Sequence, residues 1–381
     1  MEIRSNIAFK VCLVLSLLLV GLTFFGCAGV RTSPEGGSGV VVADSTLFLC
    51  PTVKQAGGVG CTAPSLKGKL VAVNSSDGSL LWEVSPEFLG AIYGNPVVAG
   101  DLVYVGGYNG KIYEINASSH LSAQEYLDKT NPQPIIGGPV VAGDRVYLGG
   151  ADGRVYALNA VSLKEEWKFP TKDKVGKIWS TPAIDGDTLY IGSFDKKLYA
   201  LDTKTGKEKW GKPFETEGAI ISTPLVYGNT VYIGSFDRHL FAVDATDGSL
   251  KWKFMADSWF WAKPLAYNNV IYAPCLDHKV YALDAKTGEK IADFDLGSPI
   301  SSSPVLLGSL VVIASEEGKV YTIDTSSNQL KLLAELGETI YAPLGTTSCG
   351  CGEVVYIYTR GQNLYALNAA SGAKLWSQTI K

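Results

Sequence analysis

The sequence predicts an all-β protein, an eight-bladed β-propeller built from four-stranded antiparallel blades. The first observation is that the segment "LYALDTKTGKEKW", Leu198 to Trp210, recurs in related form along most of the 381 residues. The second is composition, because 42 glycines and 19 tyrosines beside 2 methionines suit many strands joined by tight turns. The third is that 46% hydrophobic and 18% charged residues indicate a large buried core.

The repeat is easiest to follow in its central tetrapeptide, which occurs eight times at intervals of 40 to 44 residues. Self-similarity at this period is typical of solenoids, propellers and arrays. The copies are VAVN at Val71, YEIN at Tyr113, YALN at Tyr156, YALD at Tyr199, FAVD at Phe241, YALD at Tyr281, YTID at Tyr321 and YALN at Tyr365.

Each copy reads as four short strands. In the fourth copy, "STPAIDGDTLYIGS" gives two strands about a turn at Asp185, "FDKK" turns into the strand "KLYALD", and "TKTGKE" turns into "KW". "YALD" is apolar at nearly every position, which suits a strand covered on both faces of its sheet. A four-stranded sheet between two like sheets is a propeller blade.

Two positions of the repeat have structural interpretations. The Asp or Asn that ends each tetrapeptide can accept hydrogen bonds from the following turn, as in an Asx turn. Eight residues later, five copies have a Trp that we expect to pack between neighbouring blades, while the other copies have Gln124, Ala292 and Leu332. The inter-blade Trp residues are Trp82, Trp167, Trp210, Trp252 and Trp376.

The propeller is expected to span residues 39–381, with the first and last copies side by side so that no sheet edge is left free. Seven blades are the alternative if the end copies merge. The sequence does not indicate which terminus supplies a closing strand.

The N-terminus is a separate segment. Arg4 and Lys10 precede the uncharged run "VCLVLSLLLVGLTFF", which is short for a membrane span, and the run ends before Gly26-Cys27. This segment resembles the bacterial lipoprotein signal, with Phe24 where an aliphatic residue is usual. The resemblance implies a signal peptide at 1–26, lipidation of Cys27, a flexible tether at 27–38 and an extracytoplasmic, membrane-anchored protein. Plain secretion and an uncleaved anchor are the alternatives.

The charge balance argues against nucleic acid as a partner. The formal net charge is −4, and removal of residues 1–26 takes away one acidic and two basic residues, which leaves −5. The aligned repeats show no basic run.

The pattern Ala-x-Asp-x-x-Thr-Gly-x-x-x-Trp, as in "ALDTKTGKEKW" and "AVDATDGSLKW", resembles the repeat of quinoprotein-type propellers, named after pyrroloquinoline quinone (PQQ). PQQ-dependent dehydrogenases are longer and carry loops that hold calcium, a base aspartate and, in many, a disulfide between adjacent cysteines. This chain has short turns and no adjacent cysteine pair, the nearest being Cys349 and Cys351. We therefore expect no enzyme activity, no PQQ and no calcium.

Acidic and histidine residues do not form a recognisable catalytic or metal set. Asp101, Asp144 and Asp185 stand where hairpin turns are expected, which favours a turn role over metal binding. His239 and His278 fall in equivalent hairpins of the fifth and sixth copies, shifted by one position, and His120 lies in the irregular second copy. We interpret them as exposed turn residues.

The cysteines are compatible with an oxidising compartment. Cys50 and Cys61 flank the insertion "CPTVKQAGGVGC" of the first copy and form the candidate disulfide. Cys349 and Cys351 lie in a turn of the eighth copy on the opposite face, where they could bridge each other or stay a redox-active or metal-binding pair. Cys275 ends a strand and is expected to be an inert thiol.

One feature points to recognition. Alternate copies place an aromatic residue three positions before the recurring proline, while the intervening copies have Ile136, Ile221 and Ser301. Tyr341 lies near the matching place, with its register off by one. These side chains are expected near one mouth of the central channel, as strand-start packing or as a ring that grips a ligand or peptide. The candidate recognition residues are Tyr93, Trp179, Trp259, Trp261, Lys263 and Tyr341.

Repeat, size and lipoprotein signal together resemble the BamB-type lipoproteins, eight-bladed propellers of the machinery that assembles β-barrel proteins in the outer membrane. The resemblance implies a non-catalytic scaffold that binds an envelope or membrane protein partner, with a barrel-assembly complex as the expected partner. A ligand-binding or sensing propeller for a carbohydrate or small molecule is the alternative, and a quinoprotein oxidoreductase is a further one. If the source cell has no outer membrane, the assembly role fails and a cell-surface binding propeller is left.

Overall fold

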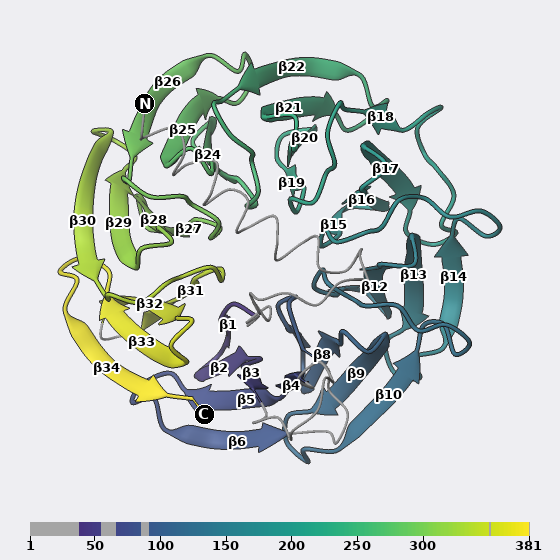
Figure 1. Ribbon diagram of the computed structural model, residues 1–381, viewed down its shortest axis with the longest axis horizontal. Helices are drawn as coiled ribbons and strands as arrows, with labels where there is room; N and C mark the ends of the chain where they lie inside the picture. Colours follow the sequence, from purple (N-terminus) through teal and green to yellow (C-terminus); the bar gives the residue numbers. More distant parts are fainter. Residues whose placement is uncertain (1–37, 55–65, 85–90, 350–351, 381) are drawn as a thin grey trace, which may run out of the picture.

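The computed structural model describes residues 38–54, 66–84, 91–349 and 352–380. These residues contain no helix, and they form eight four-stranded antiparallel sheets arranged around a ring (Figure 1). The first strand of each sheet lies innermost and the fourth lies on the rim. The structure therefore confirms the eight-bladed β-propeller and rules out seven blades. Since the described residues have no helix, they offer no apolar helical span across a membrane.

The first four blades follow the chain in order. Blade 1 contains β1 (Val41–Ala43), β2 (Thr46–Leu49), β5 (Leu70–Asn74) and β6 (Leu80–Val84). Blade 2 contains β7 (Val97–Ala99), β8 (Leu102–Gly106), β9 (Lys111–Asn116) and β10 (Ser122–Tyr126). Blade 3 contains β11 (Val140–Ala142), β12 (Arg145–Gly150), β13 (Arg154–Asn159) and β14 (Glu165–Phe169). Blade 4 contains β15 (Ala183–Asp185), β16 (Thr188–Gly192), β17 (Lys197–Asp202) and β18 (Phe214–Glu215).

The other four blades complete the ring. Blade 5 contains β19 (Leu225–Val226), β20 (Thr230–Gly234), β21 (His239–Asp244) and β22 (Leu250–Met255). Blade 6 contains β23 (Leu265–Tyr267), β24 (Val270–Pro274), β25 (Lys279–Asp284) and β26 (Lys290–Asp295). Blade 7 contains β27 (Val305–Leu307), β28 (Leu310–Ala314), β29 (Lys319–Asp324) and β30 (Gln329–Glu335). Blade 8 contains β31 (Gly345–Cys349), β32 (Gly352–Tyr358), β33 (Asn363–Asn368) and β34 (Lys374–Thr379).

Two details differ from the strands expected from the sequence. The insertion of blade 1 forms a hairpin of its own, in which β3 (Thr52–Lys54) pairs with β4 (Leu66–Gly68). In blade 4 the fourth strand was expected at Trp210 but begins only at Phe214. Pro213 lies between them, and proline has no N–H to donate to a strand ladder, which explains the late start.

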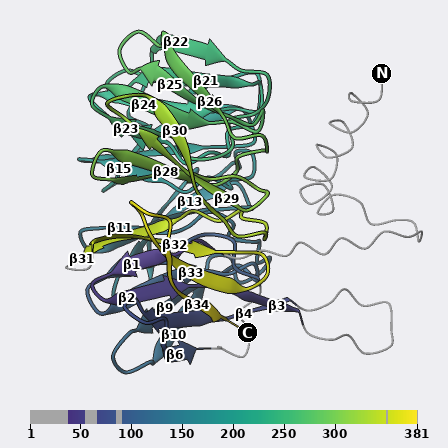
Figure 2. The same cartoon turned by 90° about the vertical axis from the view of Figure 1, so that its left-hand side faces the viewer.

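The propeller has two faces, seen edge-on in Figure 2, where β31 lies toward one side and the paired strands β3 and β4 lie toward the other. We call the side of the β3–β4 hairpin the mouth face. It also carries the turns between second and third strands and the segments that lead into each first strand. Backbone hydrogen bonds join these two sets of loops, for example from Phe194 N to Lys177 O at 2.9 Å. The loops of the mouth face are therefore fixed to one another.

The central tetrapeptides behave as the sequence predicts. The side-chain oxygen of the final Asp or Asn accepts a backbone N–H from the following turn in every copy, for example Thr205 N to Asp202 Oδ1 at 2.8 Å. The acceptors are Asn74, Asn116, Asn159, Asp202, Asp244, Asp284, Asp324 and Asn368. These Asx turns fix the last hairpin of each blade.

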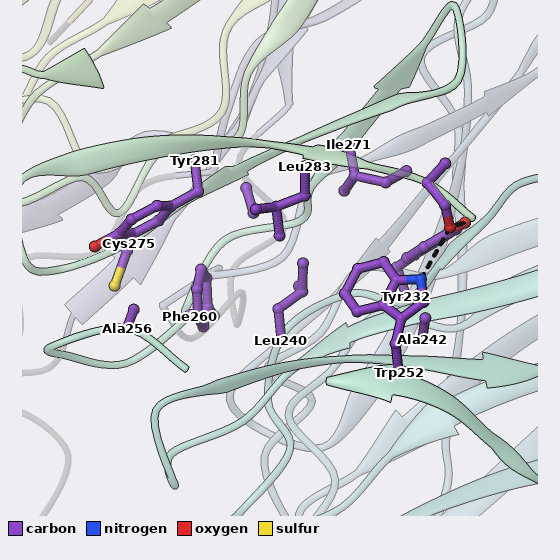
Figure 3. Close-up of a cluster of buried hydrophobic side chains, with 12 residues drawn as sticks. Tyr232, Leu240, Ala242, Trp252, Ala256, Phe260, Ile271, Cys275, Tyr281 and Leu283 are labelled. Atoms are coloured by element: carbon purple, nitrogen blue, oxygen red, sulfur yellow. Dashed lines mark hydrogen bonds between the residues drawn. The ribbon is translucent and has the colours of Figure 1, made fainter. Parts of the chain in front are cut away.

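Five of the eight blades, numbers 2, 3, 4, 5 and 8, are joined to the next blade by side-chain hydrogen bonds to the carbonyl that follows the tetrapeptide. Ala245 O of blade 5 accepts hydrogen bonds from Tyr190 Oη and Trp210 Nε1 of blade 4, both at 3.1 Å. In the same way Thr203 O accepts from Tyr147 and Trp167, Ala285 O from Tyr232 and Trp252, and Ser75 O from Tyr356 and Trp376. Figure 3 shows the junction of blades 5 and 6, where Trp252 stands beside the buried side chains of Leu240 and Leu283.

The Thr-Gly pair of the repeat belongs to the same junction. Gly248 has a φ of +79°, and a Cβ placed there would lie 2.7 Å from the indole of Trp210 in the preceding blade. Gly206, Gly288 and Gly78 lie in the same way under Trp167, Trp252 and Trp376. The glycine is thus needed both for its left-handed backbone and for the close approach of the ring.

The ring closes without a shared strand, since every four-stranded sheet among the described residues consists of strands from one stretch of chain. Blades 8 and 1 are joined by the junction already described, from Tyr356 and Trp376 to Ser75 O. Val40 N also donates to Pro343 O at 3.4 Å, and Val40 and Leu47 of blade 1 share a core with Tyr356 of blade 8.

Candidate functional site

The aromatic residues that precede the recurring proline lie in equivalent places on the mouth face. Tyr108 N donates to Ala91 O and Phe194 N to Lys177 O, which aligns Tyr93 with Trp179. The matching bond in blade 8 runs from Arg360 N to Thr339 O. It places Tyr341 at the position equivalent to Trp179. The irregular spacing in blade 8 therefore arises because Pro343 stands one residue earlier than the proline of the other blades.

A second set of aromatic side chains packs against the first. It comes from the turns between second and third strands, where each member follows the second strand of its blade. The ring centroids of Tyr93 and Tyr108 are 5.7 Å apart, and those of Trp179 and Phe194 are 4.6 Å apart with the rings edge to face. Sequence analysis missed Tyr108, Phe194 and Phe236, although their shared place in the aligned repeats was a usable signal.

Blades 5 and 6 hold a stack of three rings. The ring of Phe236 lies near parallel to two indoles, with its centroid 4.6 Å from that of Trp259 and 5.8 Å from that of Trp261. The three side chains are half-buried, so part of the stack faces solvent. Offset parallel rings at these distances attract one another beyond the area they bury. The stack is therefore a rigid aromatic platform.

Blades 7 and 8 place ionisable groups on the same face. Burial raises the pKa of Glu316 to about 7. The pKa of the neighbouring Tyr341 is also raised, first by burial and then by the charge of Glu316, while Arg360 acts in the opposite direction. Ser301, the equivalent of Trp179 in blade 7, has its hydroxyl beside Glu316, where it opposes the effect of burial on the pKa of that carboxyl. A carboxyl with this pKa carries a proton about half of the time near neutral pH.

Two further groups at the mouth lack the partners that their chemistry calls for. The buried Nε1 of Trp179 donates to no acceptor among the described residues. Lys263 has an exposed side chain, yet the surrounding atoms desolvate its ammonium and lower its pKa. No carboxylate in the described ranges forms an ion pair with this lysine. A polar group left unpaired in a partly dry place is a candidate for contact with a ligand.

The structure brings the six candidate recognition residues to one face but divides them between two regions. Trp259, Trp261 and Lys263 lie in the segment that enters blade 6, and Trp179 lies in the segment that enters blade 4. Tyr93 and Tyr341 lie on blades 2 and 8. Among the aromatic side chains of this face, Tyr108 and Tyr341 are exposed, at 45% and 40%, while Tyr93, Trp179, Trp259 and Trp261 are half-buried.

Other residues singled out in the sequence lie elsewhere. Asp101 and Asp144 follow the left-handed glycines of hairpin turns, and Asp185 precedes one, as a turn role requires. His239 is half-buried at the start of β21, with its Nδ1 3.2 Å from Asp237 Oδ1, and His278 is half-buried at a left-handed turn position of φ +80°, so neither is the exposed turn residue that the sequence predicted. His120 is exposed, and its ring lies tilted against Trp82 with the centroids 5.0 Å apart. Among the described residues, no three His, Cys, Asp or Glu side chains are grouped as metal ligands would be.

The cysteines are placed only in part. Cys50 is fully buried at the end of β2, and burial raises the pKa of its thiol to about 12. Cys61, Cys351 and Cys27 lie outside the described residues, so the disulfide, the tight bridge and the lipidation stay predictions. Cys275 is fully buried, and burial raises its pKa as well, which keeps the thiol protonated and unreactive.

Comparison with known proteins places this propeller in a family. A family model described as outer membrane protein assembly factor BamB matches residues 35–160, 66–210, 164–266 and 276–381. The chain belongs to the BamB family. No curated protein matches its sequence.

Solved structures resemble the BamB-family chain at the level of the fold. BamB from Moraxella catarrhalis is 19% identical with a TM-score of 0.63, over 88% of this chain and 92% of that one. The computationally designed Ika8 protein is 13% identical with a TM-score of 0.69, over 86% and 94%. A europium-containing methanol dehydrogenase is 14% identical with a TM-score of 0.64, over 84% and 82%. A non-natural protein and an enzyme thus share the propeller, which shows that the fold alone does not fix an activity.

Proposed function

We propose that this chain is a non-catalytic, membrane-anchored, extracytoplasmic propeller that serves as a protein-binding scaffold in the assembly of β-barrel outer-membrane proteins. Membership of the BamB family, described as outer membrane protein assembly factors, supports the assembly role. The predicted lipidation of Cys27 would hold the propeller at the membrane, on the outer membrane or the cell surface, because two or more acyl chains give lasting attachment.

The observation that carries the proposal is the aromatic mouth face. Its rings are held by backbone hydrogen bonds between loops and by ring stacking, so little conformational entropy is lost when a partner binds. Trp and Tyr are the residues that most often dominate protein interfaces. The unpaired Nε1 of Trp179 offers a donor to a partner's backbone carbonyl.

The acidic side chains of the mouth-face turns support a structural role over a catalytic one. Asp195 and Asp277 each accept a hydrogen bond from a tyrosine hydroxyl of their own blade at 2.7 Å. Asp277 also accepts the backbone N–H of Asp257, and Asp237 accepts that of Glu217. These carboxylates hold the loops together. We accordingly propose that the protein works without PQQ or calcium.

The test is affinity capture of the full, acylated chain from its native membrane. We expect recovery of a barrel-assembly protein with the wild-type chain and its loss with the double variant Trp179→Ala/Trp261→Ala, at an unchanged melting temperature. Tyr227→Ala is the matched control, because Tyr227 is 36% exposed and follows β19 on the opposite face. This variant should still capture the partner.

Two results would contradict the proposal. The first is that the double variant still captures the partner, or that it loses the partner together with a large fall in melting temperature. The second is a stoichiometric quinone absorbance with calcium in the purified protein, which would make this chain an oxidoreductase.

A further inference from the structure

A cavity of about 310 Å³ lies between the innermost strands of blades 3, 4 and 5. Its apolar wall includes Pro182, Pro224 and Val226, and its polar lining consists of Thr181, Thr223 and Lys263. These three polar residues occupy the same position of successive repeats, directly before the proline that precedes the first strand of blades 4, 5 and 6. The volume is at the lower end of the range of small-ligand sites.

The polar groups of this cavity can all donate hydrogen bonds. Thr181 Oγ1 accepts the backbone N–H of Gly138 at 2.9 Å, which leaves its own proton free to donate into the cavity. The Thr223 hydroxyl makes no side-chain hydrogen bond within the described ranges. The ammonium of Lys263 adds further donors and the only charge among the lining residues.

This arrangement has an unbalanced positive charge. The desolvation of Lys263 disfavours its ammonium form, and no carboxylate contributes an opposing effect. An anion in the cavity would restore the lost solvation through a charge-assisted hydrogen bond. One lysine balances one negative charge, and an apolar wall favours a hydrocarbon body over a fully hydrated ion such as phosphate.

We propose that this cavity binds a monocarboxylate with a short apolar body, with Lys263, Thr181 and Thr223 as the donors to its two oxygens. The carboxylate can belong to a free organic acid or to the C-terminus of a peptide. Neither the chemistry nor the test depends on the scaffold function, since the site lies in the wall of the ring and needs no protein partner.

The test is calorimetric titration of the full chain with hexanoate, with hexanamide as the uncharged probe of the same shape and with inorganic phosphate as a second control. We expect saturable binding of hexanoate and at least about tenfold weaker binding of both controls, which corresponds to 1.4 kcal/mol. Lys263→Met should weaken hexanoate binding by about tenfold or more without lowering the melting temperature, because it removes an unpaired, desolvated charge. Lys253→Met, an equal loss of charge on the exposed strand β22, should bind as the wild type does.

A second arm identifies the source of the carboxylate. A tripeptide of apolar residues with a free C-terminus is compared with its C-terminal amide. Binding of the acid form of the peptide, of hexanoate or of both supports the site and shows which source fits. Thr223→Val, which keeps the side-chain shape and removes one donor, should weaken binding severalfold. Equal binding by the wild type and Lys263→Met, or no saturation with either acid, would overturn the proposal.

Discussion

The indole Nε1 of Trp376 in the last blade donates a hydrogen bond of 3.1 Å to the carbonyl oxygen of Ser75 in the first blade. The hydroxyl of Tyr356 reaches the same oxygen at 3.2 Å. These two bonds join the last blade to the first. Tyr356 and Trp376 thus hold the closing junction in the same way as Tyr190 and Trp210 hold blade 4 to blade 5.

Replacing Trp376 should therefore destabilise the whole ring. Trp376→Ala removes a large, partly buried ring and is expected to cost about 3 kcal/mol of unfolding free energy. Trp376→Phe keeps most of the packing and loses the hydrogen bond, for a cost of about 1 kcal/mol. Urea unfolding of both variants measures the difference. Equal costs would mean that the N–H, and not the packing of the ring, accounts for the contribution.

Gly248 and Gly228 provide a matched pair for the Thr-Gly position. Both have positive φ, at +79° and +54°, but a Cβ meets Trp210 at 2.7 Å only at Gly248 and meets nothing within 4 Å at Gly228. Gly228→Ala should cost about 1 kcal/mol through the left-handed backbone alone. Gly248→Ala should cost clearly more, since Trp210 has to move. Similar unfolding free energies for the two variants would show that the close approach carries no penalty.

The Asx turns predict acid sensitivity. Hydrogen bonds from Ser326 and Ser327 lower the pKa of Asp324 to about 2, and similar bonds lower those of Asp202, Asp244 and Asp284. Because the pKa values are lower in the folded state, the stability they provide is present above the unfolded values and is lost as the pH falls through the folded ones.

Asp324→Asn should reduce that acid dependence, because Asn accepts the same N–H bonds, as it does in four of the eight copies. The measurement is the unfolding free energy at about pH 5 and about pH 2.5. If the unfolding free energy of the variant fell with pH as steeply as that of the wild type, Asp324 would not be a cause of the loss of stability in acid.

Glu316 predicts the opposite dependence. Its pKa is raised from 4.5 to about 7 in the folded chain, so the fold binds the proton more tightly than the unfolded chain does. The contribution of Glu316 to stability is full below the unfolded pKa and declines as the pH rises through about 7. Glu316→Gln should abolish this decline and leave the variant the more stable protein at about pH 8. Thermal melting across this pH range is the readout, and a variant that follows the wild-type curve would contradict it.

The sequence could predict the repeat-internal features, because they depend on residues of one copy. The Asx turn of Asp202 and the hairpin at Asp185 follow from local turn chemistry. The partners of the tryptophans were not predictable in the same way, since Trp210 contacts Gly248 of the next copy and only the ring geometry joins them. The sequence shows this correspondence only in part. A glycine faces each of Trp167, Trp210, Trp252 and Trp376, whereas Trp82 faces His120, and Leu332 stands at the Trp position opposite Gly372.

The candidate site was predictable only in outline. Tyr93, Trp179 and Trp261 stand out because large aromatic residues alternate with Ile136, Ile221 and Ser301 at the same position of the repeat. The role proposed for Lys263 depends on the cavity. Neither the desolvation of its ammonium nor the lack of a carboxylate partner could be predicted from the sequence spacing. Thr181 and Thr223 carried no signal at all, since threonine is common at the start of strands.

The manner of closure also determines where the ring should open first. Seven junctions are backed by a covalent chain connection. Among the described residues, blades 8 and 1 are instead joined by side-chain contacts and by the backbone bond from Val40 to Pro343. Separation of that one seam exposes two blade surfaces without breaking any sheet. Amide exchange in β2 and β32 should therefore reveal a sub-global opening of lower free energy than that of the strands in blades 4 and 5.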